Sequence, residues 1–113
     1  NMVNKNYIPE KGDLVWVSFD PTLGHEQKGS RPALVVSSKE FNKAFGMTYL
    51  CPITSKKRNF ASHICFVGKD LSGFVMVEQL RSVDWKKRKI KFIKKAEKEL
   101  VLNVKNCLEA ILN

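Results

Sequence analysis

Apolar residues along this chain come mainly in short runs, which polar, glycine and proline residues separate. The first run, Asp13 to Phe19, is rich in β-branched and aromatic residues and predicts a β-strand. The second, Pro32 to Ser38, contains four consecutive apolar residues, which indicates a strand buried on both faces. The polar segment between them, residues 20–30, is long for a loop of a small fold, and long loops in compact domains are often functional.

The rest of the pattern predicts two helices and several more strands. A short helix is expected over Lys39 to Phe45, where Gly46 ends it. Near the C-terminus, apolar residues at i, i+4, i+7, i+8 and i+11 define one face of an amphipathic helix: Leu100, Val104, Cys107, Leu108 and Ile111. Further strands are expected at residues 47–53, 62–67, 73–77, 81–85 and 89–94.

Many short strands followed by one amphipathic helix predict a mainly β, α+β fold. We expect a small, strongly curved sheet or barrel whose open side the C-terminal helix covers. A length of 113 residues fits one domain, so residues 1–113 are expected to form a single unit. Trp16, in the first strand, is expected in the core, and His63, in an alternating strand, is expected to be structural.

Cysteine content and hydropathy argue against several classes of protein. Cys51, Cys65 and Cys107 are odd in number, widely spaced and without a CxxC pair, and the two histidines complete no zinc-ligand spacing. We therefore expect reduced, mostly buried thiols, no metal and no cofactor, in a cytoplasmic protein. No apolar run approaches the roughly 20 residues of a membrane-spanning helix, and the first residues contain no apolar signal segment.

Positive charge is in excess and unevenly distributed. The formal net charge is +9, which favours polyanionic partners such as nucleic acid, an acidic protein or an anionic membrane face. Residues 86–95 contain seven cations and no acid, interrupted by Ile90, Phe92 and Ile93. These apolar residues favour a strand with a basic face over a disordered tail. This segment is a candidate to bind RNA, an acidic partner or only solvent.

Polar residues that could take part in catalysis or binding fall at three predicted strand ends. They are Arg31, which stands beside a rigid proline, Thr54, and the pair Glu78-Gln79. Strand ends on one rim of a small barrel can converge, so these residues are candidates for a shared site. Arg31 could instead form an ordinary ion pair with Glu26, Thr54 could cap a turn, and Glu78 could be a solvated acid.

Three segments together carry a resemblance to a known family. They are GDLVWVSFDPTLGHEQKGSRPALVVS (residues 12–37), MTYLCPITS (residues 47–55) and VMVEQLRSVDW (residues 75–85). In this order and spacing they resemble the MazF/PemK family of bacterial toxins, in particular its ChpB-like branch. The likeness runs from about Tyr7 to the C-terminal helix. It implies an SH3-like barrel with helices, a homodimer, and neutralisation by an acidic antitoxin protein.

The resemblance also implies an activity and a set of site residues. It implies a sequence-specific endoribonuclease that cuts single-stranded RNA, chiefly messenger RNA, without a metal. The family's functional positions correspond here to Arg31 and Thr54, and Glu26 corresponds to a loop carboxylate. Glu78 stands where some members have an aspartate proposed as a catalytic base. Those members also have an arginine two positions earlier, where this chain has Met76.

Metal-free RNA cleavage through the 2′-hydroxyl needs a base, charge stabilisation at phosphorus and an acid for the leaving oxygen. Arg31 fits charge stabilisation, with leaving-group protonation as a further role, because its guanidinium presents donors matched to phosphate oxygens. Its pKa above about 12 disfavours it as a base. Glu26, Glu78 and His25 compete for that role, and the Thr54 hydroxyl can donate to a phosphate oxygen.

Other polar residues flank this proposed centre. The RNA-binding candidates are His25, Gln27, Lys28, Ser55, Lys56, Lys57, Arg58, Gln79 and Arg81. Two alternative functions fit such a basic fold: a non-catalytic SH3-like module that binds nucleic acid or an acidic peptide, and a gyrase poison of the same fold. The gyrase poisons rely on an aromatic residue near the C-terminus, whereas this chain ends in Ile111-Leu112-Asn113.

Overall fold

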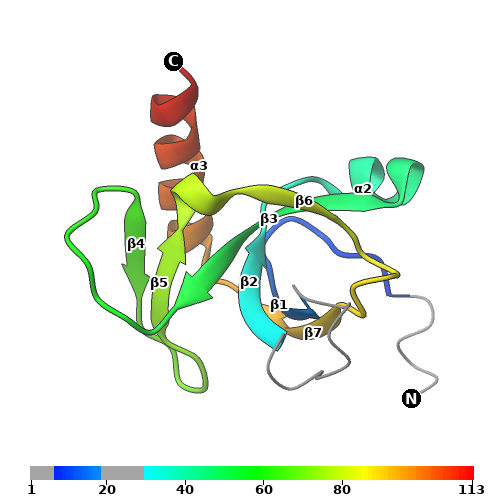
Figure 1. The fold of residues 1–113 in the computed structure, drawn as a ribbon, viewed down its shortest axis with the longest axis horizontal. Helices are drawn as coiled ribbons and strands as arrows, with labels where there is room; N and C mark the ends of the chain where they lie inside the picture. Colours follow the sequence, from blue (N-terminus) through cyan, green and yellow to red (C-terminus); the bar gives the residue numbers. More distant parts are fainter. Residues whose placement is uncertain (1–6, 19–29) are drawn as a thin grey trace.

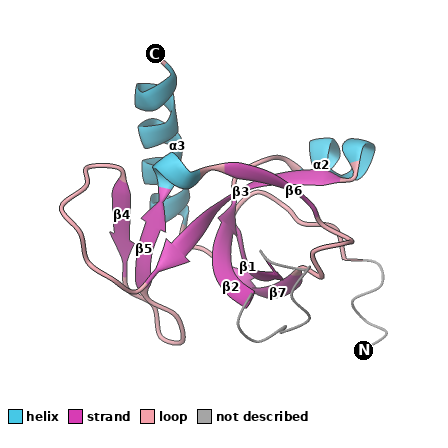
Figure 2. Ribbon diagram, viewed as in Figure 1, coloured by secondary structure: helices cyan, strands magenta, loops and turns pink. Residues whose placement is uncertain are grey.

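The computed structural model describes residues 7–18 and 30–113 of the chain. Its elements are β1 (Asp13–Ser18), β2 (Ser30–Val35), α2 (Lys39–Phe45), β3 (Met47–Thr54), β4 (His63–Phe66), β5 (Gly73–Met76), the 3₁₀ helix η2 (Val77–Gln79), β6 (Arg81–Asp84), β7 (Lys91–Lys95) and α3 (Lys98–Leu112). The strands form one curled antiparallel sheet with α3 packed at one side (Figures 1 and 2). The predicted mainly β architecture with a C-terminal helix is confirmed.

β3 is the central strand, and it changes partner along its length. One edge pairs with β2 through residues 50–52. The other edge pairs with β6 through residues 47–50 and then with β5 through Ile53 and Thr54. The full order is β4-β5-β3-β2-β1-β7, with β6 on β3. This exchange of partners curls the sheet and brings the end of β3 beside the β4–β5 hairpin.

Both faces of the central strands are buried, in two separate cores. Leu14 and Leu34 face a core that includes Leu100 and Val104 of α3. Their neighbours along β1 and β2, including Val15 and Ala33, face a second core inside the curl. Alternate side chains of a strand point to opposite faces, so burial on both sides requires the continuous apolar run seen in β2. The prediction that this strand is buried on both faces is confirmed.

The apolar face of α3 is shorter than its sequence pattern predicts. Leu100 and Val104 are buried, and Cys107 and Leu108 pack against the same core. Ile111 is half exposed, because the end of the helix extends past the sheet (Figure 1). The predicted amphipathic helix is confirmed, and Ile111, at its end, lies beyond the packed part of this face.

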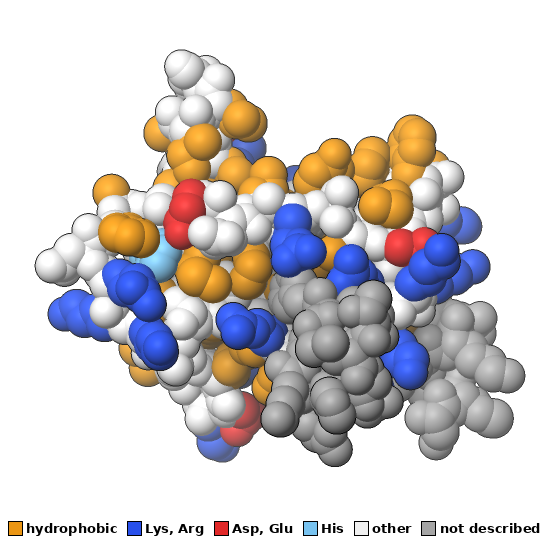
Figure 3. Space-filling view, viewed as in Figure 1, with side chains coloured by type: hydrophobic (Ala, Val, Ile, Leu, Met, Phe, Trp, Pro, Cys, Tyr) orange, Lys and Arg blue, Asp and Glu red, His pale blue; other side chains and the backbone are white. Residues whose placement is uncertain are grey.

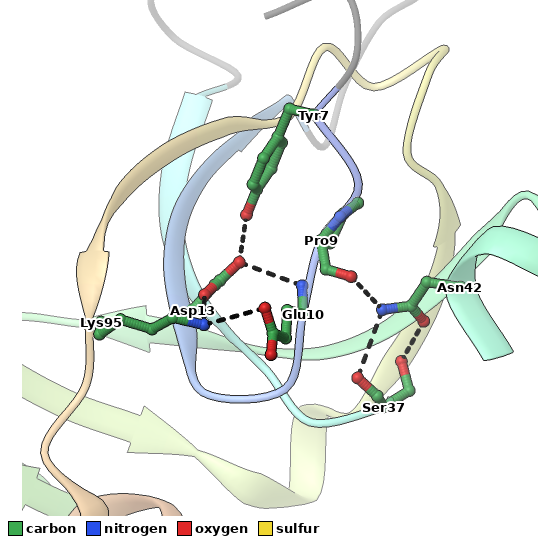
Figure 4. A network of polar contacts seen from close by, with 7 residues as sticks. All are labelled: Tyr7, Pro9, Glu10, Asp13, Ser37, Asn42 and Lys95. Carbon is green, nitrogen blue, oxygen red and sulfur yellow. Dashed lines mark hydrogen bonds and ion pairs between the residues drawn. The ribbon is translucent and has the colours of Figure 1, made fainter. Parts of the chain in front are cut away.

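A polar network fixes the start of β1 (Figure 4). The Asp13 side chain is buried; its Oδ2 accepts hydrogen bonds from the Tyr7 hydroxyl (2.6 Å) and from the Glu10 N–H (3.0 Å). Lys95 Nζ pairs with Asp13 Oδ1 at 2.6 Å, and this hydrogen bond raises the pKa of Lys95. Burial, then the hydrogen bond to Asp13, raises the pKa of Tyr7. The network ties β1 to β7.

Several predicted boundaries and burial states are wrong. β2 begins at Ser30 and ends at Val35, so its pairing starts before Pro32. Residues 86–89 form a turn rather than a strand, because the Asp84 carboxylate accepts the N–H groups of Lys86 and Lys87 and Lys89 takes a left-handed conformation (φ 53°). Only residues 91–95 of this basic segment form a strand.

Trp16 and one thiol depart from their predicted burial. Trp16 is 43% exposed, because it lies opposite Pro32 and Lys91 on a part of the sheet that α3 does not reach. Cys65 is exposed, whereas Cys51 is buried and Cys107 is half-buried. In the part of the chain that the structure describes, no helix is long and apolar enough to span a membrane.

Candidate active site

Arg31 and Thr54 occupy equivalent positions at the open end of the β2–β3 ladder. The last pair of this ladder toward that end is Ala33 with Pro52. Arg31 and Thr54 each lie two residues beyond it, so strand alternation directs both side chains to the same face of the sheet. The two strands diverge from this point (Figure 1). The side chains therefore stand on either side of the point where the pairing ends.

Arg31 is exposed, although the residue opposite it on β1 and the last three residues of β2 are buried. It lies opposite Val17 of β1, and the three residues from Ala33 to Val35 are completely buried. Pro32 fixes its own φ and restricts the residue before it to extended conformations, which holds the Arg31 backbone in the strand. An exposed guanidinium on a rigid strand end can bind an anion without leaving a buried charge unpaired.

The Thr54 hydroxyl oxygen already accepts one hydrogen bond. Its Oγ1 accepts a hydrogen bond from the Lys56 N–H at 3.2 Å. A hydroxyl that accepts one bond in this way keeps its own hydrogen as a donor. Thr54 is half-buried at the end of β3, so this donor is accessible at the rim. It therefore has the chemistry that a phosphate oxygen requires.

Glu78 belongs to a compact cluster with Ser62 and His63. The Ser62 hydroxyl donates to Glu78 Oε1 at 2.5 Å, and His63 Nε2 lies 2.8 Å from Glu78 Oε2. The His63 side chain is 2% exposed and that of Glu78 is 31% exposed. Burial raises the pKa of Glu78, but the hydrogen bonds from Ser62 and His63 outweigh it, so the pKa lies below its ordinary value. Glu78 is thus held ionised in a fixed orientation.

The His63–Glu78 cluster lies on the same face as Thr54 but at a distance from it. Thr54 pairs with Phe74, and His63 pairs with Met76, two residues further along β5. Two inter-strand spacings and this two-residue offset separate the Thr54 and His63 backbones by about 12 Å. The fold therefore brings Arg31 and Thr54 to one end of the β2–β3 ladder and places His63, the partner of Glu78, on the β4–β5 hairpin.

The cationic candidates surround this face. Ser55, Lys56, Lys57 and Arg58 follow Thr54 directly, and all are exposed, as are Gln79 at the end of η2 and Arg81 at the start of β6. Figure 3 shows Lys and Arg side chains gathered around an apolar area on this face of the molecule. In residues 7–18 and 30–113, no group of three or more His, Cys, Asp or Glu side chains is arranged to hold a metal ion.

Comparison with known proteins identifies the family. A family model described as the PemK-like, MazF-like toxin of type II toxin-antitoxin system matches residues 10–112. The chain belongs to this family. It is 42% identical to the endoribonuclease toxin ChpB of Escherichia coli (strain K12) over 119 positions, covering 98% of this chain and 99% of that protein. The endoribonuclease toxin MazF of the same organism is 38% identical over 82 residues, 73% of this chain and 74% of that protein.

Solved structures of family members have the same fold. A crystal structure of MazF from Deinococcus radiodurans matches with a TM-score of 0.84 and 34% identity, covering 95% of this chain and 98% of that one. A MazE-MazF crystal structure from the same organism also matches with a TM-score of 0.84, at 29% identity and 96% and 98% coverage. The family and the fold that the sequence motifs indicated are therefore confirmed.

Four of the predicted site residues of this PemK/MazF chain lie outside the described residues. They are His25, Glu26, Gln27 and Lys28, all in the segment 19–29. The alternative of an Arg31–Glu26 ion pair falls there too. The roles of these residues, and the choice among His25, Glu26 and Glu78 as the base, stay predictions.

Sequence reasoning missed Ser62 and the role of His63. Both lie at the start of β4 and contact Glu78, which is 15 or 16 residues later in the chain. His63 is buried, as expected of a structural residue, but its partner is a candidate site residue. The alternating pattern of residues 62–67 placed His63 on one face of a strand, and only the pairing of β4 with β5 could reveal which carboxylate it faces.

Proposed function

We propose that this chain is the toxin of a type II toxin–antitoxin system, a single-domain endoribonuclease that cleaves single-stranded RNA, chiefly messenger RNA, at specific sequences. The family match and the relatives named endoribonuclease support this activity. The observation that carries the site is the placement of Arg31 and Thr54 at equivalent positions beyond the last β2–β3 pair. An exposed guanidinium and a hydroxyl with a free hydrogen then face the same side of the sheet.

The proposed reaction uses the substrate's own 2′-hydroxyl and no metal. A base removes the 2′ proton, the 2′ oxygen attacks phosphorus, and the bond from phosphorus to the 5′ oxygen of the next nucleotide breaks. The products are a 2′,3′-cyclic phosphate and a 5′-hydroxyl, which receives a proton from an acid. DNA lacks the 2′-hydroxyl, so it cannot undergo this reaction.

Arg31 and Thr54 have complementary roles in this proposal. Arg31 stabilises the negative charge that builds on the phosphate oxygens, and its fork of donors orients them. The Thr54 hydroxyl, whose oxygen already accepts the Lys56 N–H, donates its hydrogen to a phosphate oxygen. The exposed cations that follow Thr54 bind neighbouring phosphates of the strand. The base is one of Glu26, His25 and Glu78.

Two partners follow from the same proposal. The solved MazE-MazF structures favour an acidic antitoxin that binds the basic surface of this chain. We also propose a homodimer that acts in the cytoplasm. The apolar side chains left exposed on α3 and α2, Leu102, Ile111, Leu112 and Phe45, are surfaces that a second copy could cover.

Incubation of the purified protein with single-stranded RNA in excess EDTA tests the activity. We expect cleavage, with cyclic phosphate ends on the upstream fragments. Arg31→Ala and Thr54→Val should each lower the rate by roughly a hundredfold or more, because each removes a donor to the developing charge. Lys43→Ala, an exposed change on α2, is the matched control and should cleave at the normal rate.

The alternative of a non-catalytic binding module predicts a different result. In that case RNA stays intact although the protein binds it, and Arg31→Ala changes only affinity. Intact RNA in the presence of folded protein, or equal cleavage rates in both site variants and the control, would exclude the proposed mechanism.

A further inference from the structure

Glu78, His63 and Phe60 form a local unit beside the proposed reaction centre. The Phe60 ring meets the His63 ring edge-on, with centroids 4.9 Å apart and planes at 73°. The imidazole also contacts Glu78, with Nε2 of His63 lying 2.8 Å from Oε2 of Glu78. Phe60 is 54% exposed although it is a large apolar residue. The unit thus presents an exposed aromatic ring and an ionised carboxylate that both contact one buried imidazole.

The backbone holds this unit rigidly. The His63 N–H donates to the Phe60 carbonyl (3.1 Å), which closes the turn before β4. The Val77 N–H donates to the Ser62 carbonyl (3.0 Å), which ties η2 to the same turn. Phe60 and Glu78 are therefore fixed relative to one another, although 17 positions separate them in the sequence.

The Glu78 carboxylate keeps acceptor capacity for a ligand. An ionised carboxylate offers about four lone-pair sites, and Ser62 and His63 each occupy one, on different oxygens. The side chain is 31% exposed, so remaining sites are accessible. A neutral imidazole that donates through Nε2 has no hydrogen on Nδ1, and Nδ1 of His63 is buried without a hydrogen-bond partner among residues 7–18 and 30–113. The geometry favours Glu78 as a fixed acceptor.

The same features make Glu78 a poor base for the reaction. Two donors that stabilise the charged carboxylate weaken its affinity for a proton, whereas an efficient general base has a pKa near the working pH. Ideal strand spacings also place the backbone of His63 about 12 Å from that of Thr54. A phosphate bound between Arg31 and Thr54 lies at the end of the β2–β3 ladder, and the base of a neighbouring nucleotide can reach Glu78.

We infer that Phe60 and Glu78 form a subsite for one unpaired nucleobase that carries an exocyclic amino group, near the cleaved phosphate. Aromatic side chains stack unpaired bases in single-stranded RNA, and a carboxylate accepts a hydrogen bond from an amino group such as that of cytosine. Uracil has carbonyl oxygens in place of the exocyclic amino group, and its one ring donor, N3–H, stands between two carbonyl oxygens that the carboxylate repels, so uracil is the weaker ligand. The subsite selects adenine, cytosine or guanine over uracil at one position. This inference rests on RNA being the substrate, as proposed above.

In this subsite Ser62 and His63 are positioning residues. They hold the Glu78 oxygens toward the ligand and keep the carboxylate charged, and neither needs to touch RNA. His63→Gln should therefore weaken the preference against uracil in the same direction as a change at Glu78, because it loosens the carboxylate. A purely structural role of His63 would alter stability without changing the base preference.

The first experiment measures the base preference of cleavage. A pool of single-stranded RNAs with randomised sequence is cleaved by the protein and its variants, and the product ends are sequenced. Glu78→Gln should reduce the discrimination against uracil at one position by roughly tenfold or more, the worth of a good base contact. Phe60→Ala should lower cleavage at all sequences, whereas Phe60→Tyr, which keeps the ring, should not. Lys43→Ala again serves as the control.

The second experiment measures binding without cleavage, so that the inference is tested even if the protein is no nuclease. Fluorescence anisotropy compares short RNAs that differ only in uracil content, bound to Arg31→Ala and to Arg31→Ala/Glu78→Gln. We expect the preference for amino-bearing bases only when Glu78 is present. An equal loss of rate for all sequences in Glu78→Gln, with the preference unchanged in both assays, would overturn the subsite and favour Glu78 as the base. Absent cleavage with a Glu78-dependent preference in binding would overturn only the proposed nuclease.

Discussion

Asn42 allows a quantitative test of how the sheet and α2 are joined. Its side chain is fully buried, and Figure 4 shows its contacts with Pro9 and Ser37. Nδ2 donates to the Pro9 carbonyl at 2.7 Å and to the Ser37 carbonyl at 3.3 Å, and Oδ1 accepts from the Ser37 hydroxyl at 2.6 Å. These bonds connect three segments: the residues before β1, the residues that follow β2, and α2.

Asn42→Ala should destabilise the protein by about 3 kcal/mol. Each of the three hydrogen bonds contributes about 1 kcal/mol net, and their loss also leaves buried acceptors without partners. For a domain of this size the change corresponds to a fall in Tm of about 10–15 °C. The backbone carbonyl of Asn42, which accepts the Trp85 indole N–H at 2.9 Å, is retained in the variant. The effect therefore isolates the side chain.

Urea unfolding at fixed protein concentration measures this effect. We expect a lower midpoint with an unchanged m-value, because the surface exposed on unfolding is nearly the same. The neighbouring exposed change Lys43→Ala should stay within about 0.5 kcal/mol of the parent. A loss below about 1 kcal/mol for Asn42→Ala would refute the view that this network joins the three segments.

Two further predictions concern titratable groups. The fold raises the pKa of Tyr7, so the contribution of the Tyr7 phenol to stability is complete below its ordinary pKa of about 10 and is lost as the pH rises above that value. Between pH 9 and 11, the free energy of unfolding of Tyr7→Phe should therefore fall less steeply than that of the parent. An identical slope for the two proteins would contradict this. Burial raises the pKa of the Cys51 thiol to about 12, so at pH 8 the folded protein should be alkylated at exposed Cys65 and not at Cys51; peptide mapping checks this, and rapid labelling of Cys51 in the folded state would refute it.

The fold was predictable from the sequence because the hydrophobic pattern and the turn residues indicate the same strands and helices. The apolar run of β2 indicated burial on both faces, and the spacing of apolar residues in α3 indicated its packed side. Trp16 was not predictable in the same way. Its position in a strand rich in apolar residues fits a core. Its exposure depends on how much of the sheet α3 covers, and this is decided by tertiary packing.

The candidate site was predictable only where its residues are defined by local sequence. Arg31 and Thr54 stand at strand ends, and strand ends are visible in the pattern of turn residues. The Glu78 cluster depends on a pairing between β4 and β5, which no local signal specifies. The turn at residues 86–89 is similar, because one carboxylate, Asp84, decides between a turn and the longer strand that the alternating residues also allow.

The position of Thr54 itself depends on a residue 19 places later in the chain. A Cβ added to Gly73 would lie 2.7 Å from the Thr54 carbonyl oxygen and 3.0 Å from the Ile53 side chain. Only glycine therefore lets β5 begin this close to the end of β3, where Ile53 and Thr54 exchange pairing with Val75 and Phe74. That pairing joins the end of β3 to the hairpin that carries His63. A single glycine thus sets the spacing between the Arg31–Thr54 centre and the Glu78 subsite.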